Sequence, residues 1–194
     1  MYMCRFSEAS KKKLGNAILY IAKNAKYPYK TEVLKLLFLM EERMVQLYHV
    51  PFLAIPFSVW RLGPVSVDVF EELSDGPVLL DGFISLQTNN NGVKVIAEKE
   101  FDEDEFSDAE LDVMEHVMRK YGSMTSEQLI NETHKYGSLW QITAKEHGLL
   151  NDFEAKRANS SNIILDMGSL LCPDDRKFYE ESLAIRQSAN QMQL

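Results

Sequence analysis

Apolar residues recur at steps of three and four over residues 8–25, the spacing that places side chains on one face of an amphipathic helix, and Ser7 stands before them as a candidate N-cap. A second helical pattern covers residues 31–49 and ends before Pro51. Its apolar side chains extend around more than half of the helix circumference: Val33, Leu34, Leu36, Leu37, Leu39, Met40, Met44, Val45 and Leu47. This width predicts a central helix that is mostly buried.

The middle of the chain predicts shorter elements. Residues 51–60 favour an extended segment that ends at the turn Arg61-Leu62-Gly63-Pro64. Pro64 suits the first position of a helix, so we expect a helix to start there. Two strand-like runs between residues 83 and 101 flank Asn89-Asn90-Asn91-Gly92, which predicts a β-hairpin.

Four further helices are predicted in the second half. Ser107 with Glu110 and Thr125 with Gln128 have the spacing of capping boxes, which open helices reaching about residues 121 and 136. Helices over residues 138–147 and about 174–188 follow. The predicted fold class is mainly α (α+β): a single compact helical domain of about six to seven helices with a small antiparallel β-hairpin.

Composition places this fold in the cytoplasm. The content of hydrophobic residues is 45%, that of an ordinary packed domain. No apolar run reaches the roughly eighteen residues that cross a membrane, so no membrane association is expected. Cys4 and Cys172 lie far apart and show no Cys-x-x-Cys spacing, which indicates reduced thiols.

Charge is unevenly distributed along the chain, whose net charge is -8. Residues 1–50 contain nine basic and four acidic side chains, whereas residues 102–136 contain ten acidic and three basic ones. An acidic middle argues against a nucleic-acid surface there, because phosphate binding needs clustered cations. We expect the Lys11-Lys12-Lys13 run to lie on a solvated face.

Motifs that carry enzymatic chemistry are absent. The sequence has no Gly-rich phosphate loop, no Gly-x-Ser-x-Gly and no His-Glu-x-x-His, and its four histidines lack ligand spacing. We therefore expect no catalytic residues, no cofactor and no metal. An enzyme whose site is assembled from scattered residues stays open as a third class.

Three blocks carry a resemblance to a known family. Residues 35–41, KLLFLME, resemble the KLLYLAD-like helix of the Panacea domain of SocA-like antitoxins, although Glu41 stands where aspartate is usual. Residues 60–65, WRLGPV, are similar to the family's aromatic-x-x-Gly-Pro-Val turn. The third block runs from Ser107 through Tyr121-Gly122 and Thr133-His134 to Trp140. The resemblance implies one Panacea-like domain over residues 1–194, with a recognisable core of about 10–145 and a C-terminal helical extension of about 150–194.

The resemblance implies an antitoxin-like, protein-binding module, carried by phages or other mobile genetic elements, that neutralises a toxin encoded beside it. The mechanism is direct binding or presentation of the toxin to a protease, and a basic toxin, with a protease or chaperone, is the expected partner. The candidate residues for partner binding or architecture are Leu37, Glu41, Trp60, Gly63, Pro64, Thr133, His134 and Trp140. We expect Thr133 and His134 to hydrogen-bond the Gly63-Pro64 turn. We expect Trp60 and Trp140 to anchor the joint, by which we mean the contact between this turn and the helices that follow residue 107.

The alternative function is a DNA-binding transcriptional regulator of a mobile element that uses residues 107–136 as a helix-turn-helix. Its recognition helix would carry Glu127 and Glu132 against one lysine, Lys135. Such a helix is a poor partner for phosphates and major-groove edges.

Overall fold

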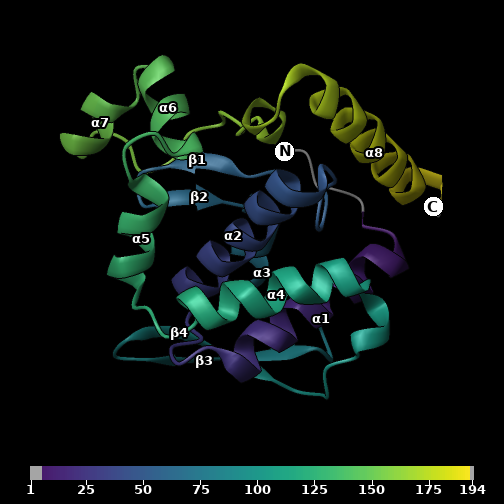
Figure 1. The fold of residues 1–194 in the computed structure, drawn as a ribbon. Helices are drawn as coiled ribbons and strands as arrows, with labels where there is room; N and C mark the ends of the chain where they lie inside the picture. Colours follow the sequence, from purple (N-terminus) through teal and green to yellow (C-terminus); the bar gives the residue numbers. More distant parts are fainter. Residues whose placement is uncertain (1–5, 193–194) are drawn as a thin grey trace.

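The computed structural model describes residues 6–192, and both N-terminal helices lie where the hydrophobic periodicity predicts them. Helix α1 spans Glu8–Asn24, and the Ser7 side chain caps it by accepting from the Ser10 amide. Helix α2 spans Lys30–Tyr48 and runs through the middle of the molecule (Figure 1).

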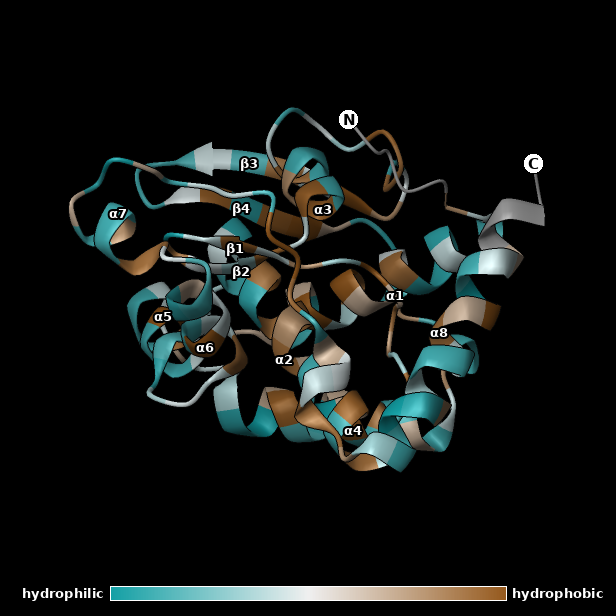
Figure 2. Cartoon of the chain, turned by 90° about the horizontal axis from the view of Figure 1, so that it is seen from above, coloured by the Kyte–Doolittle hydropathy of each residue, from teal (hydrophilic) through white to brown (hydrophobic). Residues whose placement is uncertain are grey.

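Helix α2 supplies more of the buried hydrophobic side chains than any other element. Side chains on nearly its whole circumference are at most 5% exposed: Val33, Leu34, Leu36, Leu37, Phe38, Leu39, Met40, Met44 and Val45. Figure 2 shows α2 in the middle of the molecule, largely in hydrophobic colours, with α8 at the edge mostly hydrophilic. The prediction of a central buried helix is therefore confirmed, except that Leu47, in its last turn, is 47% exposed.

The turn at Gly63-Pro64 forms a strand and not a helix start. Strand β1 spans Ser58–Trp60 and pairs antiparallel with β2, Gly63–Val65. Helix α3 begins only at residue 67 and spans Val67–Glu72. The expectation of a helix beginning at Pro64 was wrong because Gly63, with φ +101, folds the chain back along β1, and proline is tolerated in such a short edge pairing.

The second hairpin confirms the prediction made from its asparagine-rich turn. Strand β3 spans Ile84–Asn89 and pairs antiparallel with β4, Gly92–Ala97. Residue 92 has φ +119, a conformation that glycine adopts without steric cost. The described chain therefore contains two small hairpins where one was expected.

Helices make up most of the second half. After the 3-10 helix η1, Glu103–Glu105, both predicted capping boxes are formed, at α4, Asp108–Tyr121, and at α5, Ser126–His134. The remaining elements are α6, Leu139–Glu146, α7, Leu150–Glu154, the 3-10 helix η2, Met167–Leu170, and α8, Pro173–Met192. Residues 6–192 thus form eight α-helices and two strand pairs, and the mainly α fold class is confirmed.

The uneven charge of the chain is partly neutralised within the fold. On α1, Lys13 pairs with Glu110 at 2.5 Å, and Lys12 pairs with Glu105. Lys23 pairs with Glu100. Because the Lys13 side chain is only 20% exposed, the lysine run is not wholly on a solvated face. The basic N-terminal segment, residues 1–50, therefore binds part of the acidic segment, residues 102–136.

Arg186 is one of several contacts that hold helix α8 against the rest of the fold, beside the buried Tyr179, the Arg176–Asp166 ion pair and the His49–Asp175 contact. Arg186 donates to the Phe52 carbonyl at 2.7 Å and to the Glu110 carboxylate at 3.2 Å. Cys172, just before this helix, is exposed, while Cys4 lies outside the described residues. Within residues 6–192, no helix combines the length and apolarity needed to cross a membrane.

Candidate functional site

The turn between β1 and β2 packs directly on α2 and α5. A Cβ atom on residue 63 would lie 2.9 Å from Lys35 Cε and 2.9 Å from Thr133 Oγ1, closer than van der Waals contact permits. The positive φ of Gly63 disfavours any side chain as well. Glycine is therefore required here both by backbone conformation and by the contact between three elements.

Two hydrogen bonds fix this joint. The indole Nε1 of Trp140 on α6 donates to the backbone carbonyl of Trp60 at 2.9 Å. The Lys35 ammonium donates to the carbonyl of Pro64 at 2.8 Å. The Trp60 ring also packs edge-on against Phe70 of α3, with ring centroids 4.9 Å apart. Helices α2, α3 and α6 thus all contact the β1–β2 hairpin.

Thr133 and His134 contribute to the joint by packing and not by hydrogen bonds to the turn. Thr133 Oγ1 donates to the Ile130 carbonyl within its own helix, at 3.0 Å. The His134 ring stacks on Trp140, with centroids 3.6 Å apart and planes 10° from parallel. Its Nε2 is buried and has no hydrogen-bond partner among residues 6–192. The expected hydrogen bonds from these two side chains to Gly63-Pro64 are absent from this geometry.

His134 is electrically neutral at neutral pH. Burial, and to a smaller extent the nearby Lys35 charge, lower the pKa of His134 to about 4. Removing an imidazolium from water is unfavourable, and a neighbouring cation adds repulsion. The imidazole ring therefore stacks on Trp140 in its neutral form.

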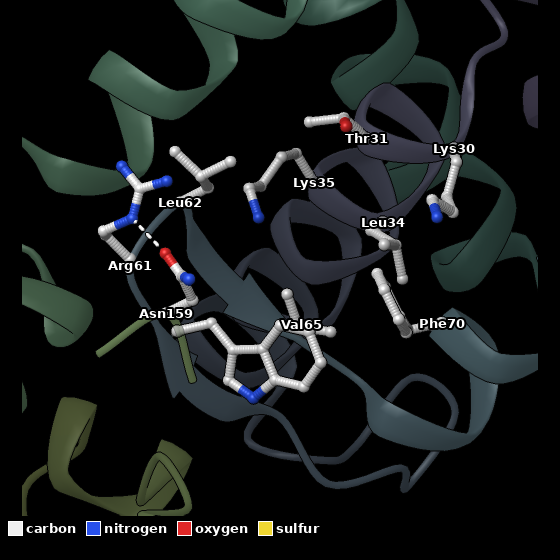
Figure 3. A pocket seen from close by; sticks show the side chains of 10 residues that line it. Lys30, Thr31, Leu34, Lys35, Arg61, Leu62, Val65, Phe70 and Asn159 are labelled. Atoms are coloured by element: carbon white, nitrogen blue, oxygen red, sulfur yellow. Dashed lines mark hydrogen bonds between the residues drawn. The ribbon is translucent and has the colours of Figure 1, made fainter. Parts of the chain in front are cut away.

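A pocket of about 280 Å³ opens beside the hairpin (Figure 3). Its lining residues come from α2, the β1–β2 hairpin, α3 and the loop after α7: Lys30, Thr31, Leu34, Lys35, Trp60, Arg61, Leu62, Val65, Phe70 and Asn159. Three of them are cations and none is acidic. The pocket is therefore apolar in its walls and positive in charge.

Lys35 is the functional candidate that sequence reasoning missed. Its side chain is 1% exposed, and burial lowers its pKa to about 7. The available signal was a lysine placed inside the apolar run of residues 33–40 of a helix expected to be buried. Long lysine side chains usually reach solvent from such positions, which made a surface location the simpler expectation.

Glu41 and Leu37 do not join this site. Leu37 is fully buried in the core. The Glu41 carboxylate, 2% exposed, accepts from the backbone amides of Phe52 and Leu53 at 3.0 and 2.8 Å. Burial raises the pKa of Glu41 to about 7, partly opposed by these hydrogen bonds. Glu41 therefore fixes the loop after α2, where Ala54 has a positive φ of 56.

Comparison with known proteins agrees with this arrangement. A family model described as "Antitoxin SocA-like, Panacea domain" matches residues 33–141, more than half of the chain. The chain belongs to this family. No curated protein and no solved structure matches it.

The Panacea domain match begins in α2 and ends in α6. It contains all eight residues singled out from the sequence, from Leu37 to Trp140, and also Lys35. Helix α8 and Asn159 of the pocket lie beyond it. Panacea membership supports an antitoxin-like role in general, with a toxin as the general class of partner.

Proposed function

We propose that this chain is an antitoxin that neutralises a protein toxin by binding it directly, without catalysis. The observation that carries the proposal is the Panacea match over residues 33–141, which spans the joint between the β1–β2 hairpin, α2, α5 and α6. Neutralisation by binding needs an exposed surface and no reactive group. Phage association and a neighbouring toxin gene are parts of the same proposal.

The corner between α5 and α6 is the surface that best fits a protein partner. Tyr136 is 95% exposed there, and Ile142 is 43% exposed. Both line a shallow open depression that also includes Gly137 and Lys145. Exposed aromatic side chains beside a rigid element are enriched among residues that dominate binding energy. We assign the toxin contact to this corner because it lies within or beside the matched range.

A basic toxin remains the expected partner. The chain has a net charge of -8, which favours encounter with a cation-rich surface. Part of the acidic segment is already paired with α1, so the attraction rests on acids that are left exposed, such as Glu103 and Asp104. This contribution should weaken as salt is added.

The test is growth of a bacterial host that expresses the neighbouring open reading frame alone, with this chain, and with two variants. Tyr136→Ala should abolish rescue and co-purification of the toxin. Phe178→Ala removes a 54% exposed aromatic on α8, outside the match, and should retain both. A harmless neighbour, or toxicity that persists beside abundant folded wild type, would contradict the proposal.

Two other mechanisms give distinct results in this experiment. An adaptor for proteolysis would lower the toxin level only in hosts that contain the relevant protease, whereas direct binding leaves the toxin intact and bound. A DNA-binding regulator would leave toxicity unchanged and bind operator DNA with a steep salt dependence. Helix α5 buries Leu129 and Thr133 and carries Glu127 and Glu132, a composition that does not favour this second function.

A further inference from the structure

The pocket beside the β1–β2 hairpin has a cation at its centre and apolar walls. Figure 3 shows the Lys35 amine directed into the space between Leu62 and Val65. Trp60 also lines this pocket. Phe70 and Leu34 complete the apolar side. An ammonium group in such surroundings is unfavourable unless an anion or several acceptors accompany it.

Lys35 has fewer acceptors than an ammonium can use. The Pro64 carbonyl is the single acceptor on Lys35 Nζ within residues 6–192, and an ammonium carries three protons. The lowered pKa of Lys35 arises from burial alone, with no carboxylate nearby to oppose it. The amine is therefore buried, charged for part of the time, and without a counter-ion from the described chain.

The other two cations of the pocket also lack acidic partners there. Lys30 Nζ lies 4.4 Å from the centre of the Phe70 ring and donates to Ser74 Oγ at 3.2 Å. Arg61 Nε donates to the Asn159 side-chain carbonyl at 2.7 Å. Neutral groups thus hold both side chains at the rim, and their charge remains available to an anion.

We propose that this pocket binds a carboxylate carried on an apolar, ring-sized body, with the carboxylate on Lys35 and the ring against Trp60 and Phe70. Of the three cations only Lys35 is buried, and one buried ammonium balances one negative charge, which suits a carboxylate better than a doubly charged phosphate. Aromatic and aliphatic walls suit the body of such a ligand. The inference does not depend on the antitoxin activity.

Binding should depend on pH in a defined direction. Only the ammonium form of Lys35 attracts the anion, and half of it is charged near pH 7. Affinity should therefore fall by about 50-fold between about pH 7 and about pH 9. The other charged or titratable groups that line the pocket or lie near Lys35 are Lys30, Arg61 and His134. The pKa of His134, lowered to about 4, keeps its ring neutral throughout this window, so its titration does not produce the trend.

The experiment is calorimetric titration of the full chain with phenylacetate, its neutral analogue phenylacetamide, and inorganic phosphate. Phenylacetate should bind at one site, and both other probes at least about tenfold more weakly. At about pH 8, binding should take up a proton, seen as a heat that varies with the ionisation enthalpy of the buffer. Lys35→Met should lose the binding and the proton uptake, whereas Lys177→Met, which removes an exposed lysine on α8, should keep both.

A second pair of ligands separates two sources of the carboxylate. A short peptide that ends in phenylalanine is compared with the same peptide as its C-terminal amide. If the acid peptide binds at least about tenfold better than phenylacetate, the natural ligand is a protein C-terminus; if the two are equal, it is a free small molecule.

The proposal is overturned if phenylacetate and phenylacetamide bind alike, if neither the acid peptide nor phenylacetate saturates the wild type, or if Lys35→Met binds like the wild type. Should Lys35→Met fail to fold, the proton uptake of the wild type decides alone. Its absence at about pH 8, with phenylacetate bound, refutes a role for Lys35.

Discussion

Replacement of Lys35 by methionine should make the protein more stable. Moving a lysine pKa from 10.5 to about 7 corresponds to a free-energy penalty of roughly 5 kcal/mol below about pH 7, because each pKa unit is about 1.4 kcal/mol. Methionine has a similar shape and no charge. It leaves the Pro64 carbonyl without its donor, a loss of about 1–3 kcal/mol. We expect a net gain of roughly 2–4 kcal/mol in the free energy of unfolding at neutral pH.

The pH dependence of this gain identifies its cause. The folded-state pKa of Lys35 lies below its unfolded value, so the unfolded chain binds more protons between about pH 7 and about pH 10.5, and the wild type gains stability across that window. The advantage of Lys35→Met should therefore shrink by about 1.4 kcal/mol per pH unit above pH 7. Urea unfolding at about pH 7, 8 and 9, with Lys177→Met as the matched control, measures the difference. A variant that is less stable than the wild type, or an advantage that is independent of pH, would refute the reasoning.

Three further substitutions test the contacts around α2. Gly63→Ala should lower the free energy of unfolding by about 2–4 kcal/mol. Gly76→Ala should lower it by only about 1 kcal/mol, because Gly76 has a similar φ of +104 but nothing within 4 Å of its Cβ position. Equal losses in urea unfolding would contradict the contact of Gly63 with Lys35 and Thr133. Glu41→Gln should cost about 1–3 kcal/mol of stability at about pH 5 and less at about pH 7.5. The reason is that the raised pKa of Glu41, about 7, makes the wild type lose stability as pH rises. A cost of the substitution that grows with pH would contradict this reasoning. Arg186→Met should cost about 1–3 kcal/mol and speed hydrogen exchange in α8, whereas Lys177→Met, an exposed control on the same helix, should do neither.

Local patterns explain why most elements were predicted correctly. The capping box of Ser107 with Glu110, like that of Thr125 with Gln128, satisfies backbone donors within four residues and needs nothing from the rest of the chain. The asparagine-rich turn before Gly92 is equally local. These local elements form without tertiary contacts, so their sequence patterns predict them correctly.

The joint could be predicted only in part, because its decisive contacts join distant residues. Pro64 fits the start of a helix or an edge strand, and the contact of Gly63 with Lys35 and Thr133 selects the strand. The hydrogen bond from Trp140 to Trp60 spans 80 positions. Sequence reasoning identified both tryptophans and the turn, whereas the hydrogen bonds that join them depend on how α6 packs beside the hairpin.

Helix α2 carries two buried ionisable groups whose roles differ in how well they are satisfied. Glu41 has a backbone amide on each of its oxygens and Arg186 nearby, so the unfavourable effect of its burial is partly opposed by these contacts. Lys35 has one carbonyl and an open pocket. If architecture were its whole purpose, an apolar side chain would serve better, because a partly satisfied buried charge destabilises the fold. A stability penalty at a pocket is typical of residues kept for binding. Of the two buried ionisable groups of α2, Lys35 is therefore the one to which we assign a binding role.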